Sequence, residues 1–258
     1  MTTLRDEIKT EIRVRFYENV NGQFPCLDGY NKQHDGAEGD WLTKAMGLTV
    51  NGRNEPDFKG FEMKKDSAKT TFGDWSPDEG LFVVVPPARK PEMDRTQFLI
   101  AFGVPRIADD GVTVKRHSWS GTVFPKVGGV NGYGQVITVD EGNNVLAEYN
   151  YDVDERRNKQ ALVPTRYHKG IVTLAKWSAS RLKQRLEKKF NQFGWFKCLK
   201  DSSGKYCGIQ FGKPVDFMTF IALVRTGDVF CDCGMYSTNF RPYMTWRASK
   251  KIWERLEE

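Results

Sequence analysis

Residues 56–64 bring together side chains that could hydrolyse a phosphodiester bond. The segment reads Pro-Asp-Phe-Lys-Gly-Phe-Glu-Met-Lys, with Asp57 just before a glycine turn and with Glu62 and Lys64 two positions apart. If 61–64 is extended, Glu62 and Lys64 share one face of the strand. Carboxylates hold hard divalent cations, which polarise a phosphate and lower the pKa of an attacking water. A lysine beside that water can orient it and stabilise the developing negative charge.

In this interpretation Asp57 and Glu62 bind Mg²⁺, for which Mn²⁺ could substitute, and Lys64 acts on the water. The pattern alone is short, because acidic and basic residues alternate on many exposed strands. Its context is more specific, since Phe61 and Met63 would point the other way, into a core. The context therefore favours a functional site over a solvated strand.

Two helices are predicted ahead of this segment. Apolar residues at helical spacing predict a helix over 3–19 that packs one face on the core. A second helix is predicted from Asp35 onwards, with Trp41 and Leu42 on its apolar side and Gly47 as its stop. Both helices are expected to be scaffold.

The remaining elements predict an α/β fold with a mixed sheet. Strands are predicted over 61–64, 81–85 and 97–103, the last two as buried strands. Turn pairs such as Asp110-Gly111 and Asn131-Gly132 separate short β-rich pieces within 104–166, which indicates hairpins or an inserted lobe.

The C-terminal part is predicted to alternate helices and strands. The predicted elements are a helix over 177–190 with Ser178 as a candidate N-cap, a hairpin of 195–200 and 206–211, a helix over 215–226, a strand over 228–232 and a helix over 249–257. The chain then divides into 1–103 with the catalytic segment, a β-rich 104–166, and a C-terminal 167–258 packed on the core.

Composition is compatible with a nucleic-acid partner. The 258 residues carry a formal net charge of +6, and basic residues interleave with aromatic ones in 176–200 and 239–255, as expected of a surface that contacts phosphates and bases. A solvated helix face would give the first cluster equally well. No apolar stretch reaches the roughly 18 residues of a membrane span, and the N-terminus lacks a signal-peptide pattern, so a cytoplasmic protein is expected.

The five cysteines are expected to be reduced thiols. They form no CxxC pair, and the close pair Cys231 and Cys233 would share a face of a strand. A regulatory disulfide or a metal site at this pair is the alternative.

Several separated segments resemble the MvaI/BcnI-type restriction endonucleases, which are relatives of the nicking enzyme MutH. The N-terminal match runs through GAEGDWLTKAMGL, PDFKGFEMKK and a Thr-Thr-Phe…Ser-Pro stretch at 70–77, and the distant match through WSASRLKQRLEKKF and TGDVFCDCGMYSTNFRPYMTWRA. Both matches occur in the order found in the family, which is harder to obtain by chance than one motif.

The resemblance implies a restriction-endonuclease-like PD-(D/E)xK core, a mixed β-sheet flanked by helices, with an inserted β-rich DNA-recognition lobe. It places Asp57, Glu62 and Lys64 at the catalytic positions, around Mg²⁺ and double-stranded DNA. It also implies a monomer that cuts the strands one at a time, in a prokaryotic or phage-encoded system with a cognate DNA methyltransferase in the host.

One position departs from the family pattern. Relatives often carry a glutamate on the preceding helix, and that position is Thr43 here. Glu38 or Asp40 could supply a metal ligand only if the helix were shifted, and otherwise they form an acidic helix start.

Further DNA contacts are expected from basic side chains. Lys65 and Lys69 would contact phosphates if their strand faces DNA, although simple solvation is as plausible. Arg241 and Arg247 are candidates for reading guanine, with an Arg247 buried against a carboxylate as the alternative. Of the three histidines, His34, His117 and His168, the second has the most DNA-like setting, between basic and aromatic residues.

The leading hypothesis is thus a type II restriction endonuclease acting at a short duplex site. The alternatives are a MutH-like nicking repair enzyme or a homing or phage nuclease with the same core, and an inactive DNA-binding protein of the same fold. The intact Asp57, Glu62 and Lys64 set argues against the inactive protein, whereas Thr43 argues for it.

Overall fold

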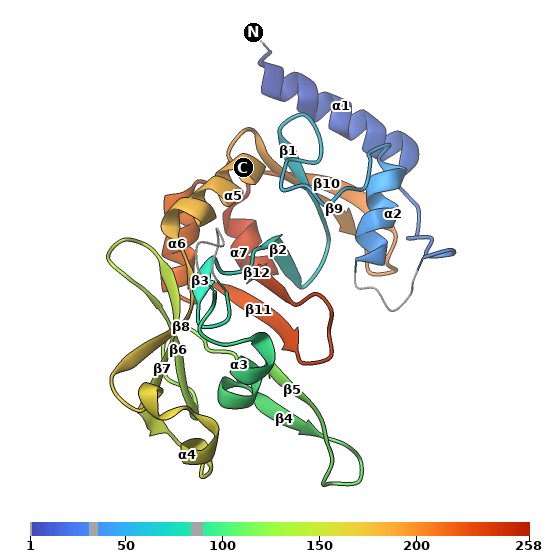
Figure 1. The fold of residues 1–258 in the computed structure, drawn as a ribbon. Helices are drawn as coiled ribbons and strands as arrows, with labels where there is room; N and C mark the ends of the chain where they lie inside the picture. The colour runs from blue at the N-terminus through green and yellow to red at the C-terminus, as the bar shows by residue number, and fades with distance from the viewer. Residues whose placement is uncertain (1, 31–35, 84–89) are drawn as a thin grey trace. The chain divides into compact units, whose positions relative to one another are not determined.

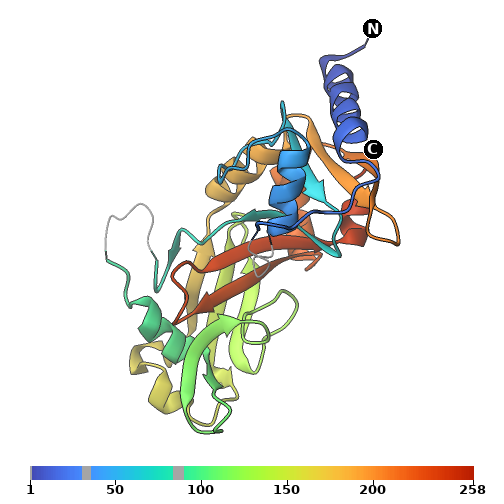
Figure 2. The ribbon, with the colours of Figure 1, turned by 90° about the vertical axis from the view of Figure 1, so that its right-hand side faces the viewer.

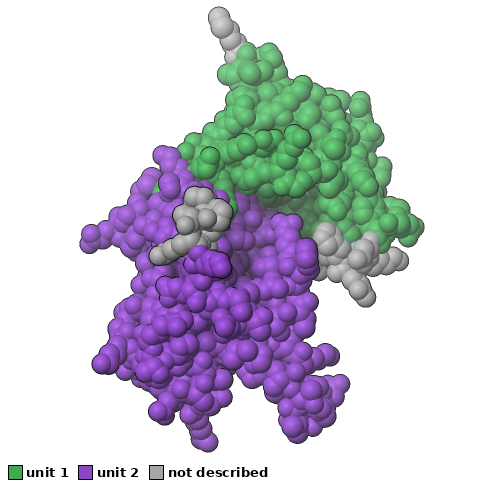
Figure 3. Space-filling view, viewed as in Figure 1, with its two compact units in different colours: residues 1–70, 184–217, 249–258 green, residues 71–183, 218–248 purple. Residues whose placement is uncertain are grey.

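The computed structural model describes residues 2–30, 36–83 and 90–258. Figure 1 labels the helices and strands of these residues, and Figure 3 shows the two compact units that they form. Unit 1 consists of Met1–Thr70, Gln184–Phe217 and Ser249–Glu258, and unit 2 of Thr71–Lys183 and Met218–Ala248. Each unit is therefore assembled from segments that lie far apart in the sequence.

Two N-terminal helices of unit 1 confirm the prediction. Helix α1 (Leu4–Asn19) begins at the N-cap Thr3, whose hydroxyl accepts a hydrogen bond from the Asp6 backbone N–H, which satisfies a donor that the first helical turn leaves unpaired. Helix α2 (Ala37–Ala45) ends before Gly47, which has a positive φ of 71°. This glycine permits the left-handed backbone that closes the helix.

Three strands form the sheet of unit 1. Strand β1 (Phe61–Lys65) pairs in parallel with β9 (Gly194–Lys200), and β9 pairs in antiparallel fashion with β10 (Tyr206–Gly212). The predicted strand and the predicted hairpin are both confirmed. Phe61 and Met63 lie in the core cluster with residues of α1 and α2, so the side chains that alternate with them, Glu62 and Lys64, belong to the other face.

That other face is covered by helix ends from the C-terminal part of the chain. Trp195 of β9 packs edge to face on Trp253 of α7 (Lys250–Arg255), with ring centroids 4.9 Å apart. A Cβ atom added at Gly212 would lie 1.9 Å from the Trp195 ring. The glycine on β10 therefore makes room for the tryptophan that anchors α7.

Unit 2 is rich in β-structure, as predicted for 104–166. A five-stranded sheet has the order β2 (Lys69–Asp74), β12 (Tyr243–Ser249), β11 (Val229–Tyr236), β5 (Val114–Ser120), β4 (Val104–Ile107). A four-stranded sheet has the order β3 (Glu79–Gly80), β8 (Ile171–Trp177), β7 (Val145–Asp154), β6 (Tyr133–Val139). The antiparallel β11–β12 pair is drawn in red in Figure 2.

The other helices are short or follow the predicted positions. They are α3 (Arg95–Phe102), α4 (Lys159–Leu162), a 3-10 turn (Thr165–Tyr167), α5 (Ala179–Phe190) and α6 (Phe217–Arg225). Ser178 directly precedes α5, and its hydroxyl donates to Asp78. The predicted helices over 177–190, 215–226 and 249–257 are thus confirmed with shorter ends.

Two predicted strands are corrected. Residues 97–103 were predicted as a strand, but they belong to helix α3, which starts at the N-cap Asp94. The Asp94 side chain accepts a hydrogen bond from the Gln97 backbone N–H, and the Gln97 side chain accepts one from the Asp94 backbone N–H. The apolar residues that follow fit a strand or a helix, and this reciprocal cap favours the helix. Residues 81–83 lie in no strand, and 84–85 lie outside the described residues.

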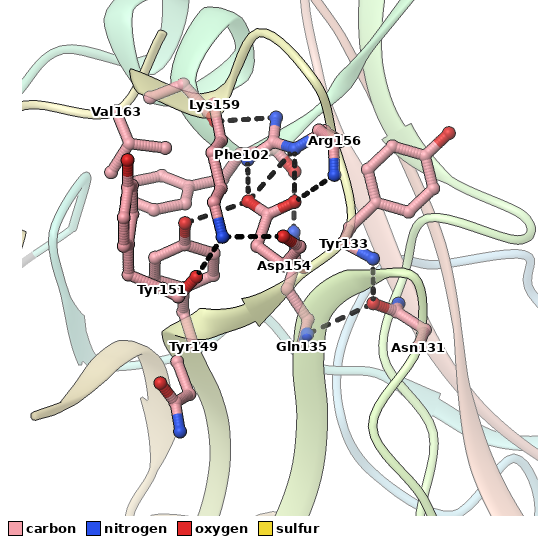
Figure 4. A network of polar contacts seen from close by, with 12 residues as sticks. Phe102, Asn131, Tyr133, Gln135, Tyr149, Tyr151, Asp154, Arg156, Lys159 and Val163 are labelled. Atoms are coloured by element: carbon pink, nitrogen blue, oxygen red, sulfur yellow. Dashed lines mark hydrogen bonds and ion pairs between the residues drawn. The ribbon is translucent and has the colours of Figure 1, made fainter. Parts of the chain in front are cut away.

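A buried polar network joins β7 to α3 in unit 2 (Figure 4). The carboxylate of Asp154 accepts hydrogen bonds from the Tyr149 hydroxyl at 2.8 Å and from the Arg156 guanidinium at 2.7 Å. The same guanidinium donates to the Ala101 carbonyl oxygen at 2.9 Å. Because each buried charge has a partner, the network can fix the end of β7 against the helix.

The cysteines are free thiols, as expected. Burial raises the pKa of the Cys231 and Cys233 thiols, which disfavours the reactive thiolate form. Within the described residues, no helix has the length and apolar character needed to cross a membrane.

Candidate active site

A tight turn brings Asp57 against the strand that carries the other site residues. Phe58 and Phe61 exchange two backbone hydrogen bonds, of 3.0 and 2.8 Å, across a turn in which Gly60 has a φ of 91°. The chain therefore reverses, and the Asp57 Oδ2 atom accepts a hydrogen bond from the Met63 backbone N–H at 2.9 Å. The turn explains why the acidic residue can stand five positions before Glu62 and still meet it.

Glu62 and Lys64 form a buried ion pair on the face of β1 that looks away from α1 and α2. The Lys64 Nζ atom lies 2.7 Å from Glu62 Oε1, and the two residues are only 6% and 2% exposed. The sequence prediction that they share a face is confirmed. The Lys64 Nζ atom also lies 5.1 Å from the centre of the Phe190 ring of α5.

A second ammonium reaches the same glutamate oxygen. The Lys189 Nζ atom, from the last turn of α5, lies 2.9 Å from Glu62 Oε1. The other oxygen, Glu62 Oε2, is buried and accepts no hydrogen bond from any described residue. One carboxylate oxygen of Glu62 therefore has two ammonium partners, and the other, which is buried, has none among the described residues.

The surroundings of Asp57 disfavour its negatively charged form. Burial first, and then the negative charge of Glu62, raise the pKa of the Asp57 carboxyl to about 7. Burial lowers the pKa of the Lys64 ammonium, and the charge of Glu62 acts in the opposite direction. Both shifts show that the cluster disfavours uncompensated charge.

The residues present fit a hard divalent cation. Two carboxylates, Asp57 and Glu62, meet here, and one buried oxygen of Glu62 lacks a partner. Such an oxygen is costly unless something binds it. Within the described residues there is no group of three or more histidine, cysteine, aspartate or glutamate side chains that could hold a metal. A cation here would complete its shell with water and phosphate oxygens, as Mg²⁺ commonly does.

Glu38, which was considered as a metal ligand from the preceding helix, is engaged by other side chains. Its carboxylate accepts hydrogen bonds from Lys200 Nζ and the Tyr206 hydroxyl, each at 2.8 Å, and lies 3.4 Å from Lys65 Nζ. Lys65 alternates with Lys64 along β1, so Glu38 belongs to the opposite face. The hydroxyl of Thr43 donates to the Gly39 carbonyl within α2.

The histidines within the described residues, His117 and His168, both belong to unit 2. His168 stacks on Tyr151 with ring centroids 3.9 Å apart, and its Nε2 atom lies 2.8 Å from the Val163 carbonyl oxygen. His117 lies in β5 of unit 2, where its backbone N–H donates to the Ser237 hydroxyl at 3.1 Å. His34 lies outside the described residues.

The side chains predicted to contact DNA differ in their exposure and in their ion pairs. Arg241 is 83% exposed, with 3.6 Å between its guanidinium and the Asp74 carboxylate. Arg247 is ion-paired with Asp232 at 3.2 Å, which was the alternative weighed for it. Lys69 lies at the exposed start of β2.

Lys189 is the site residue that sequence reasoning missed. It was included only in a basic cluster and in the helix predicted over 177–190. A signal was present, because Lys189 follows Leu186 by three positions and precedes Phe190, which places it beside the apolar stripe of the helix. A lysine on that side of a helix needs a buried acidic partner.

The chain is similar to known restriction endonucleases. The family model of the LlaMI restriction endonuclease matches residues 24–258. The type II restriction enzyme ScrFI of Lactococcus lactis subsp. cremoris is 37% identical over 258 residues, covering 93% of this chain and 94% of that protein. The solved complex of restriction endonuclease MvaI with its cognate DNA substrate has a similar fold, with a TM-score of 0.58 and 14% identity over 100% of this chain and 98% of that one. The expected mixed α/β fold is thereby confirmed.

Proposed function

Because the chain belongs to the LlaMI restriction endonuclease family and is thus a type II, site-specific deoxyribonuclease, we propose that it cuts duplex DNA with Mg²⁺ at Asp57, Glu62 and Lys64. The observation that carries this assignment is the buried Oε2 atom of Glu62, which has no hydrogen-bond partner among the described residues and belongs to a carboxylate beside that of Asp57. Enzymes of this kind generally use a divalent metal, and the pair of carboxylates suits Mg²⁺ or Mn²⁺.

The protein side chains have distinct roles in this proposal. Asp57 and Glu62 hold the cation, which supplies a lowered pKa for water and polarisation of the scissile phosphate. Asp57 is oriented by the Met63 N–H, and Glu62 by ammonium groups on its Oε1 atom. Lys64 orients the attacking water and stabilises the negative charge that develops on phosphate oxygens. Its burial against Phe190 limits competing bulk water.

The proposal extends to DNA recognition and assembly. Lys65, Lys69 and His117 are proposed to contact the phosphate backbone, and Arg241 and Arg247 to read bases, with residues 104–166 contributing a recognition lobe. The enzyme is proposed to act as a cytoplasmic monomer that cuts one strand at a time. A host methyltransferase would protect the same sites.

The test separates binding from cleavage. Lys64→Ala should bind the specific duplex as the wild type does and lose cleavage by at least about a hundredfold, because only the transition state carries the charge that Lys64 meets. Lys59→Ala is the matched control, since Lys59 lies in the same segment but pairs with Glu11 at the surface. Full cleavage by Lys64→Ala in Mg²⁺ would reject the assignment.

Plasmid digestion gives the second readout. A restriction enzyme converts supercoiled plasmid into defined linear fragments, passing through open-circular product if the strands are cut one at a time. Sequencing of the fragment ends then yields the site and the stagger. Persistent open-circular product would indicate a nicking enzyme instead.

A further inference from the structure

A second lysine stands at the catalytic carboxylate without an assigned role. The Nζ atoms of Lys64 and Lys189 lie 2.7 and 2.9 Å from the same atom, Glu62 Oε1. Lys64 comes from the same strand as Glu62, whereas Lys189 comes from α5, far along the chain. One carboxylate oxygen can accept hydrogen bonds from both ammonium groups, but here both lie on Oε1 while the buried Oε2 has no partner among the described residues.

The end of α5 is held in place by contacts on the approach to Asp57. The Asn54 side chain donates to the Arg185 carbonyl oxygen at 2.6 Å. Phe193, just after the helix, donates its N–H to the Gly60 carbonyl oxygen at 3.0 Å. The position of Lys189 is therefore fixed relative to the turn that carries the site.

Lys188 and Lys189 are neighbours with different surroundings. The Lys188 side chain is 56% exposed and pairs with a half-exposed carboxylate, whereas the Lys189 side chain is 17% exposed and pairs with a carboxylate that is 3% exposed. A buried partner implies a strong and specific interaction, since exposed ion pairs contribute little. Lys188 thus provides a control from the same helical turn.

We infer that Lys189 is a positioning residue of the nuclease site, which holds Glu62 by its Oε1 atom so that Oε2 stays directed toward the divalent cation. This inference rests on the proposed function. The two ammonium groups also balance the charges of Asp57 and Glu62 while no cation is bound. The positive charge of Lys189 repels a bound cation and so weakens its binding. The same lysine keeps the Glu62 side chain in one orientation.

Substitution of Lys189 is expected to change metal affinity in an unusual direction. Removal of a merely structural side chain should leave metal binding unchanged or weaker. Removal of the Lys189 charge should instead strengthen it, by about fivefold, because a positive charge beside the cation is lost. Cleavage at saturating metal should nevertheless slow by about tenfold, because Glu62 is free to rotate.

The experiment measures Mn²⁺ binding to the protein from the electron paramagnetic resonance signal of free Mn²⁺, together with single-turnover cleavage at saturating Mg²⁺. Lys189→Met should bind Mn²⁺ more tightly and cleave more slowly, and Lys189→Arg should restore both values to within about threefold. Lys188→Met should match the wild type. Lys189→Gln removes the same charge and keeps a hydrogen-bond donor, so it reports on affinity if the methionine variant is unstable.

Two outcomes would contradict different statements. If Lys189→Met and Lys189→Gln both bind Mn²⁺ as the wild type does, or if Lys188→Met changes equally, the inference about Lys189 is wrong. If Glu62→Gln leaves Mn²⁺ binding intact, the assigned metal site, and with it the proposed function, is wrong whatever Lys189 does.

Discussion

The carboxylate of Asp57 accepts a hydrogen bond from the backbone N–H of Met63 at 2.9 Å. This contact fixes a loop residue to the strand that carries Glu62 and Lys64. The hydrogen bond therefore holds Asp57 against the strand, although Asp57 precedes Glu62 by five positions in the sequence. It also leaves Asp57 partly buried beside another carboxylate, with consequences for pH dependence.

The stability of the metal-free protein should depend on the ionisation of Asp57. Its pKa is about 7 in the folded protein, above the ordinary value of 3.8, so the folded state binds more protons than the unfolded state between these values. Stability should fall as pH rises from about 4 to 7, by no more than about 4 kcal/mol.

The check is urea unfolding of the wild type and of Asp57→Asn in EDTA between pH 4 and pH 8. The difference between the two proteins isolates this carboxyl from the others. Asp57→Asn should become progressively more stable than the wild type as pH rises, and Mg²⁺ should reduce the difference. A difference that does not vary with pH would show that Asp57 is ionised throughout.

Gly60→Ala should damage the site without touching a charged residue. Gly60 has a φ of 91°, and an added Cβ atom would lie 2.6 Å from the Gln192 side chain. We expect a loss of roughly 1–3 kcal/mol in the free energy of unfolding, together with slower cleavage. Gly52→Ala, where the added atom meets nothing within 4 Å, should change neither unfolding nor cleavage rate. Equal behaviour of the two variants would refute the argument.

Asp154→Ala should strongly destabilise the protein. It would leave the mostly buried Arg156 guanidinium without its carboxylate, at a cost of about 3–5 kcal/mol. Tyr149→Phe removes one hydrogen bond from the same carboxylate and should cost only about 1 kcal/mol. Denaturant unfolding measures both, and similar losses would mean that the charge is compensated elsewhere.

Arg241→Ala should affect recognition and leave stability unchanged. The side chain is 83% exposed and makes only a 3.6 Å ion pair, so unfolding should change by less than about 0.5 kcal/mol. If Arg241 reads a base, specific binding should weaken by roughly 1–3 kcal/mol. Competition binding in EDTA, with the duplex identified by end sequencing and with a scrambled duplex, measures this. Equal weakening for both duplexes would indicate a phosphate contact.

The sequence predicted the parts of the molecule whose signals are local. The turn at Gly60, the alternation of Glu62 and Lys64, and the helical spacing of apolar residues in α1 are properties of short segments, and each prediction is confirmed. Helix α3 was wrong because its apolar run fits a strand or a helix, and only the reciprocal cap at Asp94 decides between them.

Lys189, which the sequence did not predict as a site residue, reaches Glu62 through contacts between distant parts of the chain. Lys189 meets Glu62 only because β1 pairs in parallel with β9 and because α5 lies immediately before β9. Neither relation follows from the residues near Glu62. The side of the α5 helix on which Lys189 lies could have indicated a buried partner, but not which one.

The parallel pairing of β1 with β9 also bears on protein synthesis. The segment with Asp57, Glu62 and Lys64 leaves the ribosome early, whereas β9, its neighbour in the sheet, leaves much later. A nascent or prematurely terminated chain that ends before β9 lacks the partner strand and cannot assemble the site. Under the proposed assignment of the active site, the chain therefore acquires the ability to cut DNA only late in translation, when it is nearly complete.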